Sequence, residues 1–181
     1  MATNTVISPQ SGVNFAASYN VSASNPDYPG TPFVVGTKMD GTNASVYLFV
    51  KATSNVLQGR VVIVDDNVNW TVRQITNSLA RAALGQMVGV VSSAGTISGT
   101  SPGIPAGDYG WIQIKGYNDS VQFNTGSTAF TQAYTSATGV LMDTTSAAGV
   151  NAAVNGIVLL ATSAGNAAAA ILNWPTVGAA Q

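Results

Sequence analysis

The sequence contains no histidine, no cysteine and no glutamate, and its charged side chains are six Lys or Arg and seven Asp among 181 residues. Most enzymes take their proton shuttles, activated nucleophiles and transition-metal ligands from the residue types that are missing here. The absence of cysteine also excludes a disulfide framework and a cysteine-ligated zinc site. We therefore expect no catalytic residues, no metal site and no cofactor.

The net charge is close to zero, at −1, and no basic run occurs. The chain therefore lacks the electrostatic pattern by which proteins bind nucleic acid or an anionic membrane surface, and we expect neither partner. Because a net charge near zero favours association, much of the surface is expected to be buried in an assembly. A secreted domain kept soluble by Ser, Thr and Asn is the alternative.

Long apolar runs are also missing. The longest, at residues 157–161 and 167–172, are far shorter than the ~20 residues that a membrane-spanning helix needs. The first residues, Met-Ala-Thr-Asn-Thr, contain neither the basic nor the apolar region of a secretory signal peptide. The sequence thus predicts a soluble protein made in a cytoplasm.

Residues 1–43 differ in composition from the rest, being rich in Ser, Asn, Pro and Gly with isolated aromatic residues. Three prolines between residues 26 and 32 disfavour a regular helix or a central strand there. Such a segment is either a loop packed on its own domain or an arm that lies on a neighbouring molecule. We expect an extended N-terminal arm, and removal of residues 1–35 should then leave the rest of the chain folded. The expected partner-binding anchors of the arm are Phe15, Tyr19, Tyr28 and Phe33.

From residue 45 onward, short runs of β-branched and aromatic residues alternate with Gly, Asn, Asp and Ser. Such runs, spaced by roughly ten residues, are typical of a compact antiparallel β-sandwich or small β-barrel. The chain is therefore expected to consist of an extended arm, 1–43, and an all-β domain, 44–181. One helix-like turn is expected at residues 78–84, ended by Gly85. The expected strands are 46–51, 60–64, 70–76, 86–92, 109–115, 121–123, 139–143, 155–161 and 168–173.

The clearest alternation occurs at residues 109–115, where Ile112 and Ile114 share one face and Trp111, Gln113 and Lys115 share the other. Trp111 belongs either to a second core layer or to a contact surface, since large aromatic residues dominate interfaces.

Two further features concern the second half of the chain. Residues 117–120 are expected to form a turn that makes a hairpin with 121–123, and 168–173 is expected to be an edge strand. Trp174 follows this strand and directly precedes Pro175. We take Trp174, like Trp111, as a candidate partner-binding residue.

Two local patterns suggest chemistry but are better explained as structure. Asp65-Asp66 follows a strand, where aspartate commonly forms turns, and it lacks the spacing of a calcium loop. The Gly-rich stretch 95–107 contains no Gly-Lys-Ser/Thr element for phosphate binding. A hydrolase with only Asp side chains in its active site is the weakest alternative.

Three segments carry a resemblance to a known family. Residues 85–90 read Gly-Gln-Met-Val-Gly-Val, residues 107–116 read Gly-Asp-Tyr-Gly-Trp-Ile-Gln-Ile-Lys-Gly, and residues 171–175 read Ile-Leu-Asn-Trp-Pro. Together they resemble decoration (cement) proteins of tailed-bacteriophage heads, which carry a GQxVGV … AGDYGWVQxxG succession followed by a G-I/V-V-L strand. The resemblance covers residues 45–177 and leaves the N-terminal segment outside it.

The resemblance implies a small β-rich virion protein that binds the outer face of an assembled capsid, commonly as a homotrimer, and locks capsomers together. Its expected partner is the major capsid protein, and its expected location is the outer capsid surface, after synthesis in the host cytoplasm. No small-molecule ligand is expected. The alternative function is a phage fibre or surface carbohydrate-binding module that uses Trp and Tyr as stacking platforms.

Overall fold

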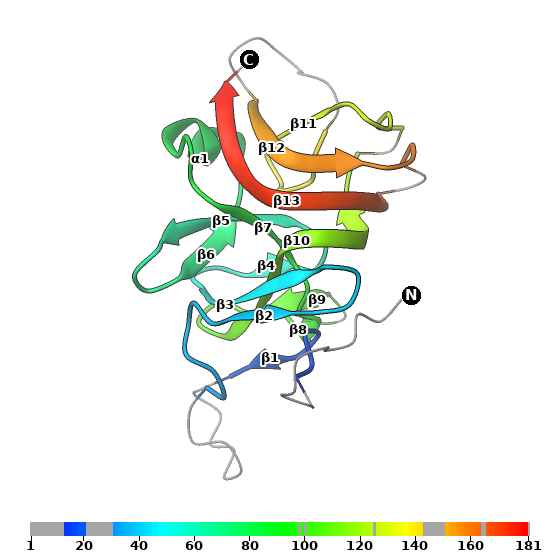
Figure 1. The fold of residues 1–181 in the computed structure, drawn as a ribbon. Coiled ribbons are helices and arrows are strands. Elements are labelled where there is room, and N and C mark those ends of the chain that lie inside the picture. Colours follow the sequence, from blue (N-terminus) through cyan, green and yellow to red (C-terminus); the bar gives the residue numbers. More distant parts are fainter. Residues whose placement is uncertain are drawn as a thin grey trace.

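The computed structural model describes residues 13–20, 31–97, 99, 101–124, 126–142, 151–163 and 166–180. Tyr28, one of the expected anchors, lies outside the described residues. The rest form an all-β fold with one short helix, as expected from the sequence (Figure 1). The elements are β1 (Ser18–Tyr19), β2 (Lys38–Asp40), β3 (Val46–Ala52), β4 (Val56–Leu57), β5 (Val61–Asp66), β6 (Thr71–Gln74), α1 (Asn77–Ala82), β7 (Val88–Val91), β8 (Gly95–Thr96), β9 (Pro102–Ile104), β10 (Tyr109–Gln122), β11 (Gln132–Tyr134), β12 (Ala152–Leu159) and β13 (Ala167–Ala180).

Five of the described strands close into a ring through the pairings β3–β10, β10–β7, β7–β5, β5–β6 and β6–β3. Four pairings are antiparallel, whereas β6 runs parallel to β3. Aliphatic side chains fill the ring, among them Leu48 and Val50 of β3 and Ile112 and Ile114 of β10. The facing predicted for the two isoleucines is therefore confirmed. The small sheet β4–β9–β8 adds Val56 and Ile104 to the same core.

A second layer covers one outer side of the ring, which gives the fold its sandwich-like character. Val61 and Ile63 of β5 and Val88 and Val90 of β7 pack there against side chains of α1, β11, β12 and β13. Figure 1 shows the curved pair β12–β13 lying along the ring, with α1 beside it. Because β5 and β7 are buried on both faces, they read as continuous apolar runs rather than as alternating ones.

The long strand β10 joins the two layers. Its first half pairs with β3 and β7 in the ring, and its second half pairs with β13. Gly116, at the change of partner, has a φ of +92°, and a Cβ there would lie 2.5 Å from the Cα of Ser45. Only glycine fits this bend without displacing backbone.

Three of the local predictions are wrong. The strand expected at 139–143 does not form over its described residues, where only Leu141 and Met142 take part in isolated bridges. The expected turn at 117–120 does not form, because β10 continues through it with a bulge between Asn118 and Val121. Strand β13 is not an edge strand, since it lies between β12 and β10. Turn-forming residues are tolerated at 117–120 because a bulge also accommodates irregular backbone.

The helix forms where it was expected. Thr76 caps its N-terminus with its side-chain hydroxyl, which accepts a hydrogen bond from the backbone N–H of Leu79. Gly85 follows the helix with a φ of +79°, the left-handed conformation that commonly ends helices. Its N–H donates to the carbonyl of Val177, so the end of the helix is tied to β13.

The other outer side of the ring carries a layer of aromatic rings. Tyr47 and Phe49 of β3 and Trp111 of β10 form its buried part. Phe15 stacks on Tyr47 with ring centroids 3.9 Å apart, and Phe33 meets Trp111 edge-on at 5.0 Å. Rings in such arrangements stabilise each other beyond the area they bury.

The described parts of residues 1–43 are therefore part of the domain, which differs from the expected arm. Strand β1 pairs with β10, and β2 pairs with β3. The hydroxyl of Ser93 accepts from the N–H of Trp111 at 2.8 Å and donates to the carbonyl of Ala17 at 2.6 Å. The boundary predicted at residues 43/44 does not separate two structural units, because the aromatic residues before it cover the ring.

Truncation of Ile114 to Ala should lower the free energy of unfolding by ~2–5 kcal/mol, because a fully buried side chain leaves a cavity in the ring. Lys115→Ala, a change at its half-buried neighbour, should alter that free energy by no more than about 0.5 kcal/mol. Urea unfolding followed by tryptophan fluorescence measures both. Equal losses would contradict the assigned faces of β10.

Phe15→Ala should cost about 3–5 kcal/mol of unfolding free energy, since it uncovers Tyr47 and Trp111. Val34→Ala is the matched control, because Val34 is 77% exposed in the same N-terminal region. Removal of residues 1–35 takes away Phe15, Tyr19 and Phe33 together and should lower the thermal midpoint further. A truncated chain that melts like the full chain would show that the aromatic layer does not depend on this segment.

Candidate functional site

The structure places the sequence-predicted contact residues in two different environments. Phe15 and Trp111 are buried within the aromatic layer, and Tyr19 and Phe33 are half-buried against it. The rings of Phe15 and Trp111 face this chain's own core, which differs from the exposed position expected of contact residues. Trp111 belongs to a second core layer, the other possibility that its pattern allowed.

Trp174 is the predicted contact residue that does reach the surface. Its side chain is 41% exposed, and Nζ of Lys38 lies 5.1 Å from the centre of its ring. A lysine ammonium over an indole face is an attractive cation–π contact. Lys38 belongs to β2, which pairs with β3, so this contact links β2 to β13.

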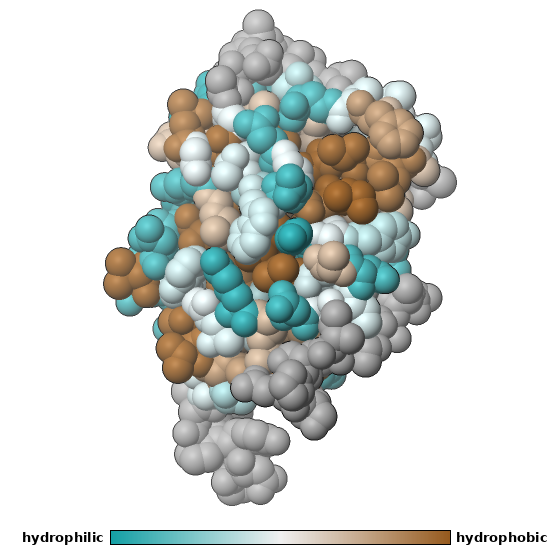
Figure 2. Space-filling model, viewed as in Figure 1, coloured by the Kyte–Doolittle hydropathy of each residue, from teal (hydrophilic) through white to brown (hydrophobic). Residues whose placement is uncertain are grey.

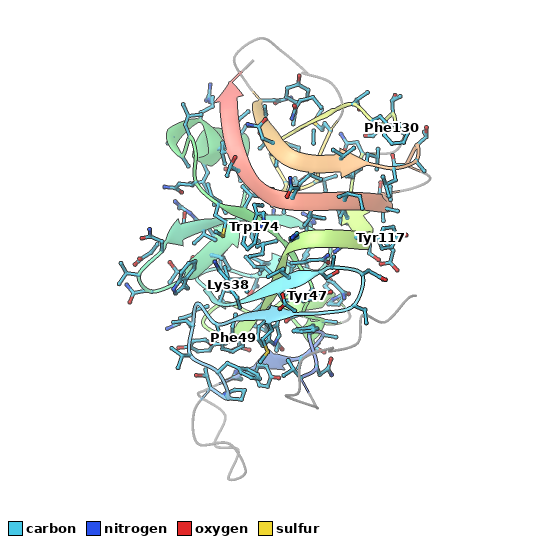
Figure 3. All side chains as sticks on the ribbon, viewed as in Figure 1. Lys38, Tyr47, Phe49, Tyr117, Phe130 and Trp174 are labelled. Carbon is cyan, nitrogen blue, oxygen red and sulfur yellow. The ribbon has the colours of Figure 1, made fainter. Side chains whose placement is uncertain are left out.

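Further exposed apolar side chains lie on the outer side of the second layer. Val158 of β12 and Ile171 of β13 are direct cross-strand neighbours, and Tyr117 of β10 is the next neighbour of Ile171. Phe130 is 74% exposed and is held beside β12 by a hydrogen bond from its N–H to the carbonyl of Leu159. We call Phe130, Val158, Ile171 and Trp174 the β12–β13 face. Figure 2 shows apolar side chains gathered over these strands, and Figure 3 shows Phe130, Trp174 and Tyr117 around them.

Backbone geometry turns two of these aromatic residues outward. Phe130 has a φ of +60° and Trp174 a φ of +49°, a region that costs a non-glycine residue about 1–2 kcal/mol. At Trp174 the cause is a bulge: between the pairs Asn155–Thr176 and Ile157–Leu172, β13 advances further than β12. Non-glycine residues held in such conformations occur often at functional sites.

The lobe that carries the β12–β13 face is almost without charge. From residue 121 to the end of the chain, Asp143 is the only charged residue in the sequence. The described residues of β11, β12 and β13 include none. Among the described residues, the charged side chains therefore all lie outside these three strands.

The aspartates occupy structural positions rather than a shared site. Asp66 holds the turn that follows β5. Its carboxylate accepts from the side-chain amide of Asn69 and from the backbone N–H groups of Asn69 and Val68, and these bonds lower its pKa. The neighbouring Asp65 pairs with Arg73 at 2.8 Å. The interpretation of Asp65-Asp66 as a turn is confirmed.

Asp108 behaves in the opposite way, since burial raises its pKa while a hydrogen bond from Asn20 partly opposes that rise. No cluster of three potential acidic metal ligands occurs within the described ranges. Within the described ranges, α1 is the only helix. Its six residues are too few to cross a membrane.

No known family model matches this chain, and no curated protein sequence matches it.

Sequence reasoning identified Trp174 but missed Phe130, Val158 and Ile171. A signal for the last two was present, because both alternate with apolar residues that face the core, Ile157 and Leu159 in β12 and Leu172 in β13. A strand with apolar side chains on both faces is either buried on both faces or has one exposed face that can bind a partner. Phe130 lies in a loop, and its left-handed backbone gives no sequence signal.

Asp66→Ala should lower the melting temperature at neutral pH, because the ionised carboxylate holds the β5–β6 turn. The pKa of Asp66 is lower in the folded chain than in the unfolded chain. The stabilisation is therefore fully present at pH values above the unfolded-state pKa, and it is lost as the pH falls through the folded-state pKa. The difference from the unmodified protein should therefore shrink on acidification. Thermal melts across the acidic range measure it, with Asp40→Ala, at an exposed position of β2, as the control. A constant difference at every pH would exclude the charged turn as the cause.

Proposed function

We propose that this chain is a virion structural protein, a capsid decoration (cement) protein that binds the outer surface of a tailed-bacteriophage head and stabilises the contacts between capsomers. The β12–β13 face is the observation that carries the proposal. The resemblance of residues 85–90, 107–116 and 171–175 to the decoration proteins suggests a capsid protein as the partner. The exposed side chains of the β12–β13 face are the ones that we propose to contact it.

The chemistry of the face supports a protein partner. Interface cores are depleted of charged residues and enriched in aromatic ones, and a few such residues dominate the binding energy. Phe130 and Trp174 are aromatic, partly exposed and held in fixed backbone positions. A side chain already held in its binding position loses less conformational entropy on association than a flexible one does.

The fold supports a role in which the protein bears load rather than turns over substrate. The ring shares its strands with two further layers, so all three are mechanically connected through β3, β5, β7 and β10. Repeated placement on a capsid lattice lets modest single contacts add up to firm attachment. No enzymatic activity is part of the proposal.

The proposed partner is the major capsid protein, and the proposed assembly of the decoration protein is a homotrimer on the capsid outer surface. The low net charge of −1 favours such association. Nucleic acid and membranes are not proposed as partners.

Phe130→Asn should weaken binding to shells assembled from the major capsid protein of the same genome by about 30-fold, the loss typical of an interface hot spot. Asparagine tolerates the left-handed conformation, so the fold should keep its thermal stability. Co-sedimentation with shells over a range of protein concentrations measures the affinity.

Val68→Asn is the matched control, because Val68 is 80% exposed at the β5–β6 turn, away from the β12–β13 face. It should bind as the unmodified protein does. Failure of the unmodified protein to sediment with any such shell would refute the decoration role. Equal loss in both variants would refute the assignment of the face.

A further inference from the structure

A groove of ≈ 270 Å³ lies between the N-terminal segment and the second half of β10, and none of the four residues of the β12–β13 face lines it. Residues 13–16 and residues 117–120 line its walls, together with Gln58, Gly59 and Ser92. Its volume is slightly below the range of about 300–1,000 Å³ that is usual for drug-sized ligands. The groove therefore suits a ligand of about one ring.

The base of the groove is rigid because its buried amide is fully hydrogen-bonded. Nε2 of Gln113 donates to the carbonyls of Lys115 and Tyr117 at 3.0 and 2.9 Å and lies 3.2 Å from the hydroxyl of Ser45. Its Oε1 accepts from Nδ2 of Asn118 at 2.8 Å. A base held in this way keeps its shape when a ligand replaces water.

The walls, in contrast, present polar atoms that have no partner within the described part of the chain. Asn14 uses Oδ1 to accept from the N–H of Ala16, and its Nδ2 is left to donate elsewhere. Gln58 uses Nε2 to donate to the carbonyl of Ser92, and its Oε1 is left to accept. The hydroxyl groups of Ser92 and Tyr117 likewise make no hydrogen bond there.

The charged and aromatic residues that line the groove indicate which chemical class of ligand it can bind. Asp119 is the only charged residue among those that line the groove, so no cation is present to bind phosphate or another anion. Amides and hydroxyls offer donors and acceptors side by side, which matches groups that both donate and accept, such as alcohols. The half-buried ring of Tyr117 adds an apolar wall for C–H groups.

We infer that this groove binds a neutral saccharide unit, a single pyranose ring with free hydroxyl groups. This activity goes beyond the proposed attachment to a capsid, and it replaces the expectation from the sequence that no small molecule binds. Tyr117 lines the groove, whereas Trp111 and Trp174 do not.

The test is an NMR titration of the full isotope-labelled chain with glucose, with N-acetylglucosamine and, as a cationic probe, with methylammonium. We expect at least one sugar to shift the amide signals of Gly59, Ser92 and Asn118 saturably at millimolar concentration. Methylammonium should leave them unchanged. No saturable shift with either sugar would overturn the inference.

Two variants separate a saccharide from a cation. Asn14→Asp keeps the oxygen that accepts from Ala16 but removes the Nδ2 donor and adds negative charge, so it should weaken sugar binding at least several-fold. Asp119→Asn removes the charge while keeping an oxygen acceptor, so sugar binding should persist. A site that gains methylammonium affinity in Asn14→Asp and loses it in Asp119→Asn, with no sugar affinity, would be a cation site and would refute the inference.

Asn67→Asp is the control for the first variant, because it makes the same chemical change at the β5–β6 turn, outside the groove. It should bind the sugar as the unmodified chain does. An equal loss in Asn67→Asp and Asn14→Asp would show that charge in general, and not the wall of the groove, controls binding. The titration needs no capsid, so its outcome is independent of the proposed decoration role.

Discussion

The structure depends on one strand, β10, that joins two layers of the large sheet, and the side-chain amide of Gln113 stabilises the bend that this requires. Where β10 leaves β3 and takes β13, the regular ladder is interrupted by a register shift between Gln113 and Lys115. The amide of Gln113 bonds the carbonyls of Lys115 and Tyr117 that the bend would otherwise leave with fewer partners. A buried carbonyl without a hydrogen-bond partner is energetically costly. The side chain of Gln113 therefore supplies hydrogen bonds that backbone N–H groups of a neighbouring strand would supply in a regular sheet.

The layers on either side of the ring follow from that bend. Because β10 continues beyond the ring, β13 and β12 can pack over β5 and β7, whose outward valines and isoleucines would otherwise be exposed. The opposite side carries tyrosine, phenylalanine and tryptophan, and the N-terminal segment covers it.

Inside that aromatic layer, the indole N–H of Trp111 has no oxygen acceptor among the described residues. Rings surround it on several sides, including Phe15 edge-on at 5.2 Å.

The sequence was sufficient for features that local chemistry decides. The all-β class, the helical turn before Gly85 and the facing of Ile112 and Ile114 follow from periodicity, caps and turn residues. Ring closure, the inner position of β13 and the continuation of β10 through 117–120 depend on pairings between distant residues, which composition does not encode. The burial of Phe15 and Trp111 depends on the same kind of distant pairing, because β1 pairs with β10 and Phe15 packs against Tyr47 and Trp111. The exposure of Trp174 also depends on tertiary structure, since the backbone bulge at this residue arises from the pairing of β13 with β12.

Ring closure also protects the protein from copies of itself. A strand with an open edge can pair with the edge of a neighbour, a hazard that grows when many copies stand close together. Within the described sheet, β2 and β11 end the main path with three residues each, and β1, which pairs only with β10, has two. Lys38 and Asp40 add exposed charges to β2, and Tyr134 of β11 already exchanges hydrogen bonds with Met142. The backbone thus offers neighbouring copies little opportunity to extend the sheet, so crowding would bring side chains rather than strands into contact.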